Sequence, residues 1–207
     1  MTKTPIEPTV FIVDDDQEVR EAIKLLMDSV GLNARGFASA QDYLDQFDPA
    51  RPGCLVLDVR MKGMSGLDLQ QRLTQLPICP PVIVITGHGD VPMAVRAIKA
   101  GAVDFIEKPF NDQTLLDAVH RAFDRDAANR GQASLLADIQ DRLTRLTPRE
   151  REILNQVVAG KRNKVIAADL AISQSTVEAH RAKVMEKMEA RSLSDLMRMM
   201  LAIGSSE

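Results

Sequence analysis

The sequence predicts an α/β protein in which a doubly wound, five-stranded parallel sheet precedes a small all-α domain of four helices. Two observations indicate the sheet: short apolar runs recur between residues 10 and 107, and amphipathic helical segments separate them. Strands that are apolar on both faces are typical of parallel sheets covered by helices. A third observation indicates the second domain, because only helical patterns follow residue 146.

The predicted strands are continuous apolar runs bounded by polar or helical segments. Four of them are clear in the sequence: Val10–Val13, Cys54–Asp58, Val82–Thr86 and Val103–Glu107. A fifth strand is expected near Asn33–Phe37, which has the least apolar pattern of the five.

Five helices are predicted to alternate with these strands. The first, Glu18–Val30, has its apolar residues on one face and is followed by Gly31, a common C-terminal signal. Ser39 and Ser65 each precede an aspartate three residues further on, a spacing that resembles a capping box. The other four helices are expected at Ser39–Phe47, Ser65–Leu76, Val91–Gly101 and Asn111–Phe123.

The composition suits a soluble globular protein, and the length suits one large domain or two modest ones. It has 207 residues, of which 45% are hydrophobic and 27% are charged. No apolar run approaches the ~18 residues that a membrane helix requires, and residues 1–9 lack the apolar core of a signal peptide. We therefore expect a cytoplasmic protein with no membrane contact.

Charge and linker composition divide the chain into three parts. Residues 1–125 carry 13 Lys and Arg against 18 Asp and Glu, whereas residues 146–207 carry 10 against 8. This difference indicates that the two parts have different tasks. Residues 126–145, which begin with small and polar side chains, are expected to form a helical linker.

Carboxylates, a hydroxyl and an ammonium follow the predicted strands at the edge where doubly wound sheets bind ligands. These residues are Asp14, Asp15, Asp16, Asp58, Thr86 and Lys108. Carboxylates that face one another need a cation, and a set of oxygen ligands suits Mg²⁺ (or Mn²⁺). A metal there could hold a phosphoryl group beside Asp58, which would attack it and form an aspartyl phosphate. The alternative, that the three consecutive aspartates only cap the first helix, leaves the other residues unexplained.

Four segments in order resemble the receiver domain of two-component response regulators, most closely the FixJ-like members. The segments are FIVDDDQEVR, LVLDVRMKGMSG, VITGHGDVPMAV and GAVDFIEKPF. The resemblance covers residues 8–125 and implies the strand order 2-1-3-4-5. It also implies that Asp58 is the phosphoacceptor and that Asp15 and Asp58 bind the metal directly. Asp14 would bind the metal through water, and the main-chain carbonyl of Arg60 would be a further ligand.

The same resemblance implies a switch that responds to the phosphoryl group. Thr86 and Phe105 would form the switch pair, Lys108 would bind the phosphoryl group, and the Lys108–Pro109 peptide bond would be cis. One residue departs from the pattern, because Lys62 stands where such families usually carry proline. Lysine leaves the loop beside Asp58 freer and adds a positive charge.

The linker carries an apolar stripe with heptad spacing. Its members are Leu136, Ile139, Leu143 and Leu146. Two heptads are compatible either with a short coiled coil or with a helix that docks onto one of the domains.

The last part of the chain reads as four short helices, the middle two of which form a helix-turn-helix. The segment NKVIAADLAISQSTVEAHRAKVMEKM resembles the LuxR-type DNA-binding domain across residues 146–203. Basic side chains surround this unit and could meet phosphates: Lys161, Arg162, Lys164, Arg181, Lys183 and Lys187. The residues expected to bind DNA are Asn163, Lys164, Ser175, Thr176, Glu178, Ala179, Arg181, Ala182 and Lys183. The alternative is a basic face that is merely solvated.

These features together predict a bacterial two-component response regulator, a transcription factor and not an enzyme apart from metal-dependent self-phosphorylation. The expected partners are a sensor histidine kinase, a double-stranded DNA operator, RNA polymerase, and a second copy of the chain after phosphorylation. One rival is a phosphatase of the haloacid dehalogenase type, whose D-x-D-x-[T/V] signature fails at Glu18. Another is a regulator whose receiver is never phosphorylated.

Overall fold

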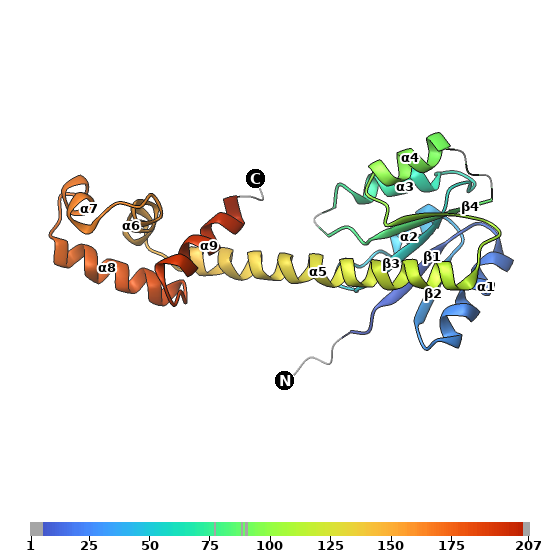
Figure 1. The fold of residues 1–207 in the computed structure, drawn as a ribbon, viewed down its shortest axis with the longest axis horizontal. Coiled ribbons are helices and arrows are strands. Elements are labelled where there is room, and N and C mark those ends of the chain that lie inside the picture. The colour runs from blue at the N-terminus through green and yellow to red at the C-terminus, as the bar shows by residue number, and fades with distance from the viewer. Residues whose placement is uncertain (1–5, 77, 88, 90, 205–207) are drawn as a thin grey trace. The chain divides into compact units, whose positions relative to one another are not determined.

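The computed structural model describes residues 6–76, 78–87, 89 and 91–204. Two compact units divide between Arg130 and Gly131, and each is described by itself (Figure 1). The first unit is an α/β sheet domain and the second is entirely helical. In the described part of the chain, no helix is both long and apolar enough to cross a bilayer.

One parallel sheet forms the centre of the first unit. Its strands are β1 (Thr9–Val13), β2 (Asn33–Phe37), β3 (Gly53–Asp58), β4 (Val82–Thr86) and β5 (Asp104–Glu107). They are arranged in the order β2-β1-β3-β4-β5, which confirms the predicted order. Each crossover is helical, as parallel strands require.

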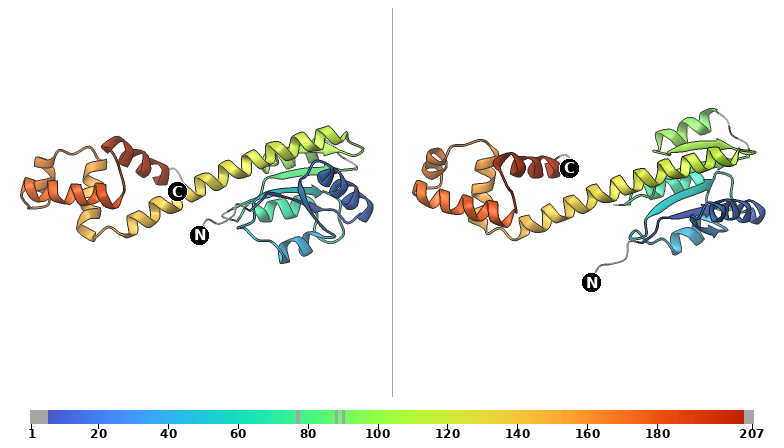
Figure 2. Two further views of the ribbon diagram at one scale, coloured as in Figure 1. Left: turned by 90° about the horizontal axis from the view of Figure 1, so that it is seen from below. Right: turned by 60° about the horizontal axis from the view of Figure 1, so that its bottom comes forward.

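Helices cover both faces of this sheet (Figure 2). They are α1 (Gln17–Ser29), α2 (Ala40–Asp45), α3 (Gly66–Leu73), α4 (Val91–Lys99) and α5 (Asp112–Thr144). Residues of α1 and α5 pack with Val10 and Ile12 of β1, whereas α2, α3 and α4 pack with Phe11 and Val13. The side chains of β1 thus alternate between two cores, which explains its continuous apolar run.

The helix ends follow from the capping residues in the sequence. Asp16 accepts a hydrogen bond from the Glu18 amide at the start of α1, so one of the three consecutive aspartates is a helix cap. Ser39 and Ser65 cap α2 and α3 in the same way. Gly31 follows α1 with a φ of +74°, in the region that favours glycine.

Helix α5 is longer than the sequence predicts. A helix ending at Phe123 was expected before a separate helical linker, but α5 runs unbroken for 33 residues. The Oδ2 atom of buried Asp126 accepts hydrogen bonds from the Gly53 amide and from Nε of Arg130, at 2.9 and 2.7 Å. Arg130 also donates to the carbonyls of Pro49 and Arg51. These contacts hold α5 against the first unit through Arg130, which is where the two units divide.

The second unit packs four further helices around its own core. They are α6 (Pro148–Val158), α7 (Asn163–Asp169), α8 (Gln174–Lys187) and α9 (Leu193–Gly204). Ile139 and Leu146 are buried in this core, and Leu143 packs against it. Three of the four residues of the apolar stripe therefore pack into the helical domain, as one of the two alternatives left open by their spacing expects.

Candidate functional site

The first candidate site lies at the carboxyl ends of the central strands. Strands β1 and β3 pair in register from Thr9↔Gly53 to Val13↔Leu57, so Asp14 and Asp58 leave the sheet at neighbouring positions. Strand β4 ends at Thr86, which pairs with Glu107, the residue before Lys108. Parallel topology therefore brings these four side chains to one edge although up to 94 residues separate them in sequence.

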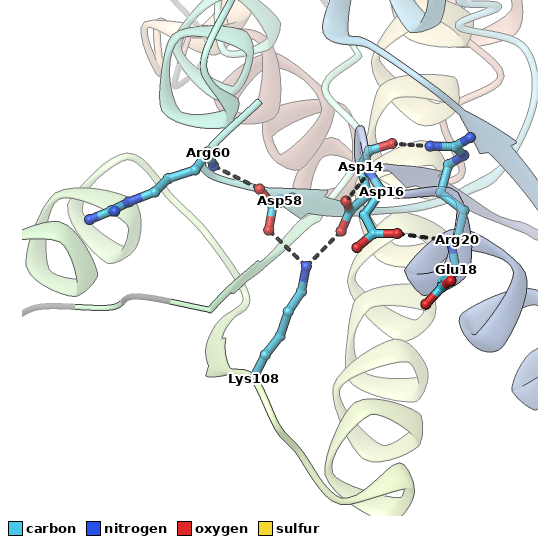
Figure 3. Close-up of polar contacts among 7 residues, drawn as sticks. All are labelled: Asp14, Asp16, Glu18, Arg20, Asp58, Arg60 and Lys108. Carbon is cyan, nitrogen blue, oxygen red and sulfur yellow. Dashed lines mark hydrogen bonds and ion pairs between the residues drawn. The ribbon is translucent and has the colours of Figure 1, made fainter. Parts of the chain in front are cut away.

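Lys108 joins the two buried carboxylates of this edge (Figure 3). Its Nζ atom lies 2.6 Å from Oδ2 of Asp14 and 2.8 Å from Oδ1 of Asp58. Asp14 is 1% exposed and Asp58 is 6% exposed, so both carboxylates are largely shielded from bulk water. A buried charge is tolerated when it is paired and hydrogen-bonded, as these two are.

Backbone contacts hold both carboxylates in place. The amide of Asp16 donates to Oδ1 of Asp14, and the amide of Arg60 donates to Oδ2 of Asp58 at 2.7 Å. The Arg60 side chain points away from Asp58 (Figure 3), which leaves its backbone as the part of Arg60 at the site. Arg20, which the sequence did not suggest, donates from its guanidinium to the carbonyl of Asp14.

Two opposing effects act on the pKa values at this site: burial disfavours the charged forms, and ion pairing favours them. Burial raises the pKa of Asp14 above its ordinary value, and the hydrogen bond from Lys108 offsets part of that rise. Burial lowers the pKa of Lys108, but its contacts with Asp14 and Asp58 outweigh this effect and leave that pKa above its ordinary value. Lys108 is therefore a charged ammonium at neutral pH.

Three carboxylates fit a divalent cation at this edge. One oxygen each of Asp14, Asp15 and Asp58 lie within 4.8 Å of one another, and Asp15 is the exposed member. Hard oxygen donors with one solvent-facing side suit Mg²⁺, which keeps several waters when bound. The predicted ligand from the main-chain carbonyl of Arg60 stays a prediction.

Thr86 and Phe105 lie beside each other around Gly89. Thr86 is fully buried and Phe105 is half-buried. A Cβ atom placed on Gly89 would lie 3.0 Å from Cε1 of Phe105 and 3.3 Å from Cγ2 of Thr86. Close approach of the backbone also explains why residue 66 is a glycine, because a Cβ atom there would lie 2.1 Å from the carbonyl oxygen of Asp58. Sequence reasoning assigned neither glycine, although GMSG and TGHG signalled turns.

The loop after β3 contains the residue that departs from the family pattern. Lys62 is exposed, whereas Met61 beside it is buried. Gly63 follows with a φ of +83°, so the chain turns immediately after Lys62. The structure therefore places Lys62 on the surface of a turn close to Asp58.

A second candidate site is the exposed face of α8 in the helical unit. Ser175, Glu178, Ala179, Ala182 and Lys183 are exposed on this helix, whereas Thr176 and Arg181 are half-buried. Ser173 caps the helix, and its hydroxyl lies 2.8 Å from both the Ser175 and the Thr176 hydroxyls. Val177 and Val184 on the opposite side are buried in the core. This division matches the predicted outward face.

Two of the basic residues expected near phosphates are engaged within the domain. Lys187 pairs with the buried carboxylate of Glu150 at 2.6 Å, and Lys161 pairs with Asp169 at 2.8 Å. Lys164 and Lys183 are exposed and form no ion pair within the described ranges. Of the six basic residues expected near phosphates, the other four therefore carry no ion pair in the described part of the chain, and they lie on or directly before α7 and α8: Arg162, Lys164, Arg181 and Lys183.

Comparison with protein families identifies a domain around each of the two candidate sites. Residues 10–120 match the family described as response regulator receiver domain, and residues 144–200 match the bacterial regulatory proteins of the luxR family. Receiver domains of this family bind Mg²⁺ at the acidic pocket that Asp14, Asp15 and Asp58 form here.

Individual proteins are similar to this chain along nearly its whole length. Nodulation protein W of Bradyrhizobium diazoefficiens is 46% identical over 99% of this chain and 90% of its own length. The transcriptional regulatory protein FixJ of Rhizobium meliloti is 50% identical over 95% of this chain and 96% of its own. Among solved structures, the response regulator StyR has a TM-score of 0.83 and 42% identity, covering 94% of this chain and 98% of its own.

Proposed function

Since the chain belongs to the FixJ-like two-component response regulators, we propose that phosphorylation of Asp58 by a sensor histidine kinase controls its binding to DNA. Proteins of this family regulate transcription and are not enzymes in the usual sense. The observation that carries the proposal is the buried Asp58 carboxylate, held 2.8 Å from Lys108 and beside Asp14 and Asp15.

The proposed chemical step is transfer of a phosphoryl group from a phosphohistidine of the kinase. A carboxylate oxygen of Asp58 attacks the phosphorus, a P–O bond forms, and the P–N bond breaks. The released imidazole takes a proton from solvent, so the kinase histidine leaves neutral. Lys108 then pairs with a phosphoryl oxygen, and the Thr86 hydroxyl donates a hydrogen bond to another.

The metal belongs to the acidic edge of this site. We assign Asp15 and Asp58 as direct ligands, Asp14 as a ligand through water, and the main-chain carbonyl of Arg60 as a further ligand. When bound, Mg²⁺ (or Mn²⁺) supplies the positive charge that offsets the carboxylates and the phosphoryl oxygens. Asp15 is the exposed member, so an incoming group would reach the site from its side.

Phosphorylation would then change the surface formed by α4 and β5. Thr86 bonded to the phosphoryl group would let Phe105 repack, which shifts a two-state equilibrium. Helix α4 carries exposed apolar side chains, Val91 at 76%, Val95 at 43% and Ile98 at 50% exposure. Contiguous exposed apolar residues favour association, so we assign this face to a homodimer of the phosphorylated chain.

The output of this switch would be a dimer that binds a two-half-site operator in double-stranded DNA. The exposed face of α8 would enter the major groove, with Lys164 and Lys183 at phosphates. From that position the regulator would contact RNA polymerase. A protein that works on the chromosome of a bacterium acts in the cytoplasm, where we place it.

A phosphate-affinity gel after incubation with acetyl phosphate and Mg²⁺ tests the proposal. The wild-type chain should give a shifted band, and Asp58→Asn should give none because an amide is not a nucleophile. Asp138→Asn, the same change at an exposed position on α5, is the control and should shift like wild type. Equal labelling of Asp58→Asn and wild type would show that Asp58 is not the phosphoacceptor. Steady release of phosphate from a phosphomonoester without a labelled chain would favour the phosphatase alternative.

A further inference from the structure

Asn163 connects the two helices of the helix-turn-helix through their polar side chains. It is the first residue of α7 and is half-buried. Its Oδ1 atom accepts a hydrogen bond from a guanidinium nitrogen of Arg181 at 2.7 Å. Its Nδ2 atom donates to Oε1 of Glu178 at 3.3 Å. Both partners belong to α8, so one amide contacts a carboxylate and a guanidinium of the neighbouring helix.

This arrangement uses both ends of the amide. Glu178 and Arg181 are three residues apart and therefore adjacent on one side of α8. They form no ion pair with each other within the described parts of the chain, and Asn163 bridges them instead. An amide can donate to the carboxylate and accept from the guanidinium at the same time, through two separate atoms.

Orientation of Glu178 matters because a carboxylate is an unusual group at a DNA surface. Phosphates repel it, so a freely rotating glutamate would turn away from the groove. A glutamate held in one orientation can accept a hydrogen bond from the N4 amino group of cytosine, which discriminates between base pairs. The hydrogen bond from Asn163 restricts the rotamers of Glu178, and Arg181 places a positive charge close by.

We propose that Asn163 is a positioning residue for operator specificity, which holds Glu178 and Arg181 so that Glu178 reads one base pair. The inference rests on the proposed DNA-binding function and adds to it, because Asn163 acts through Glu178 and need not touch a base. Substituting Asn163 should therefore change which sequence binds best, and substituting Glu178 should do the same.

The test is selection from a pool of randomised operators by the full-length chain activated with beryllofluoride and Mg²⁺. Glu178→Ala, Asn163→Ala and Asn163→Asp should all lose preference at the same base pair, by about tenfold. Asn163→Asp keeps an acceptor for Arg181 but replaces the donor to Glu178 with a repelling carboxylate. The double variant N163A/E178A should lose no more preference than Glu178→Ala alone, because the two residues act as one unit. Lys164→Ala, next to Asn163, is the control and should weaken all sequences alike.

The outcomes separate this inference from the function on which it rests. If Glu178→Ala loses the preference while both Asn163 variants keep it, Asn163 does not position Glu178, although the chain still reads DNA. If Glu178→Ala also keeps the preference, the inference is overturned as well. A wild-type chain that selects no sequence would contradict the proposed DNA-binding function itself. Thermal unfolding of Asn163→Asp checks that the altered preference does not come from a misfolded domain.

Discussion

At the acidic edge, the fold buries two carboxylates and supplies each of them with hydrogen-bond donors. Asp14 and Asp58 are almost inaccessible to solvent, yet each has backbone donors and a share of Lys108. Removal of Lys108 would leave two buried carboxylates without an opposite charge, which costs several kcal/mol. If Asp58 is phosphorylated as proposed, the added phosphoryl group would compete for Lys108 and disturb this pairing.

Lys62 gives a prediction about the lifetime of the phosphorylated state. Lys62→Pro stiffens the turn beside Asp58 and removes a charge, whereas Lys62→Ala removes only the charge. We expect Lys62→Pro to change the acyl-phosphate half-life about threefold or more, with a change in unfolding free energy below about 1 kcal/mol. Half-lives are measured by the decay of the shifted gel band. Equal half-lives for wild type and both variants would remove Lys62 from the mechanism.

Among the helices, α6 and α8 are joined by an ion pair between a buried carboxylate and a partly exposed ammonium. Thr147 and Glu150 form a capping box at the start of α6, in which each side chain bonds the backbone of the other. Glu150 also accepts a hydrogen bond from Lys187 at the end of α8. The hydrogen bond from Lys187, followed by that from the Thr147 amide, lowers the pKa of Glu150 to about 2.

This pairing predicts an acid-sensitive helical domain. Because the pKa of Glu150 is lower in the folded state than its ordinary value of 4.5, its contribution is fully present above pH 4.5 and is lost as pH falls toward 2. Glu150→Gln should destabilise the domain by about 2–3 kcal/mol at pH 7 and much less near pH 2. Urea unfolding at both pH values, monitored by amide hydrogen exchange in α6 and α8, measures this difference in stability. Glu186→Gln, an exposed glutamate on α8, is the control; an equal effect of both substitutions would contradict the role of the ion pair.

The chain as a whole combines a sheet domain that accepts a signal with a helical domain that presents a basic face. Their connection is α5, which contributes Ala122 and Asp126 to the first unit and Ile139 to the core of the second. Each unit therefore has its own core and its own site.

Association gives the prediction for the full-length chain. Light scattering with and without beryllofluoride should show a shift from monomer to dimer, because the exposed apolar face of α4 becomes part of an interface. Ile98→Asp should weaken this dimer at least about tenfold, since a charge would be buried there. Leu25→Asp, at an exposed apolar residue of α1, should dimerise like wild type. An unchanged mass over a wide range of concentrations would contradict dimerisation through α4 and β5.

Local patterns in the sequence were enough to predict the strands, most of the helices and the edge of the sheet where the candidate site lies. Apolar runs identified β1, β3, β4 and β5, and capping residues such as Ser39 and Ser65 marked where helices begin. The meeting of Asp14, Asp58 and Lys108 followed from parallel topology, which places all strand ends of one kind at the same edge.

The tertiary structure alone decided which polar groups are paired and where α5 ends. Lys187 looked like a phosphate contact in the sequence but is held by Glu150, and Asn163 gained two partners on another helix. Arg130 donates hydrogen bonds to the carbonyls of Pro49 and Arg51, and Ile139 packs into the core of the helical unit. Both contacts join residues that are far apart in the chain. Periodicity reports only which face of an element is apolar. Which neighbour covers that face, and which charge meets it, depends on packing between elements that no local pattern encodes.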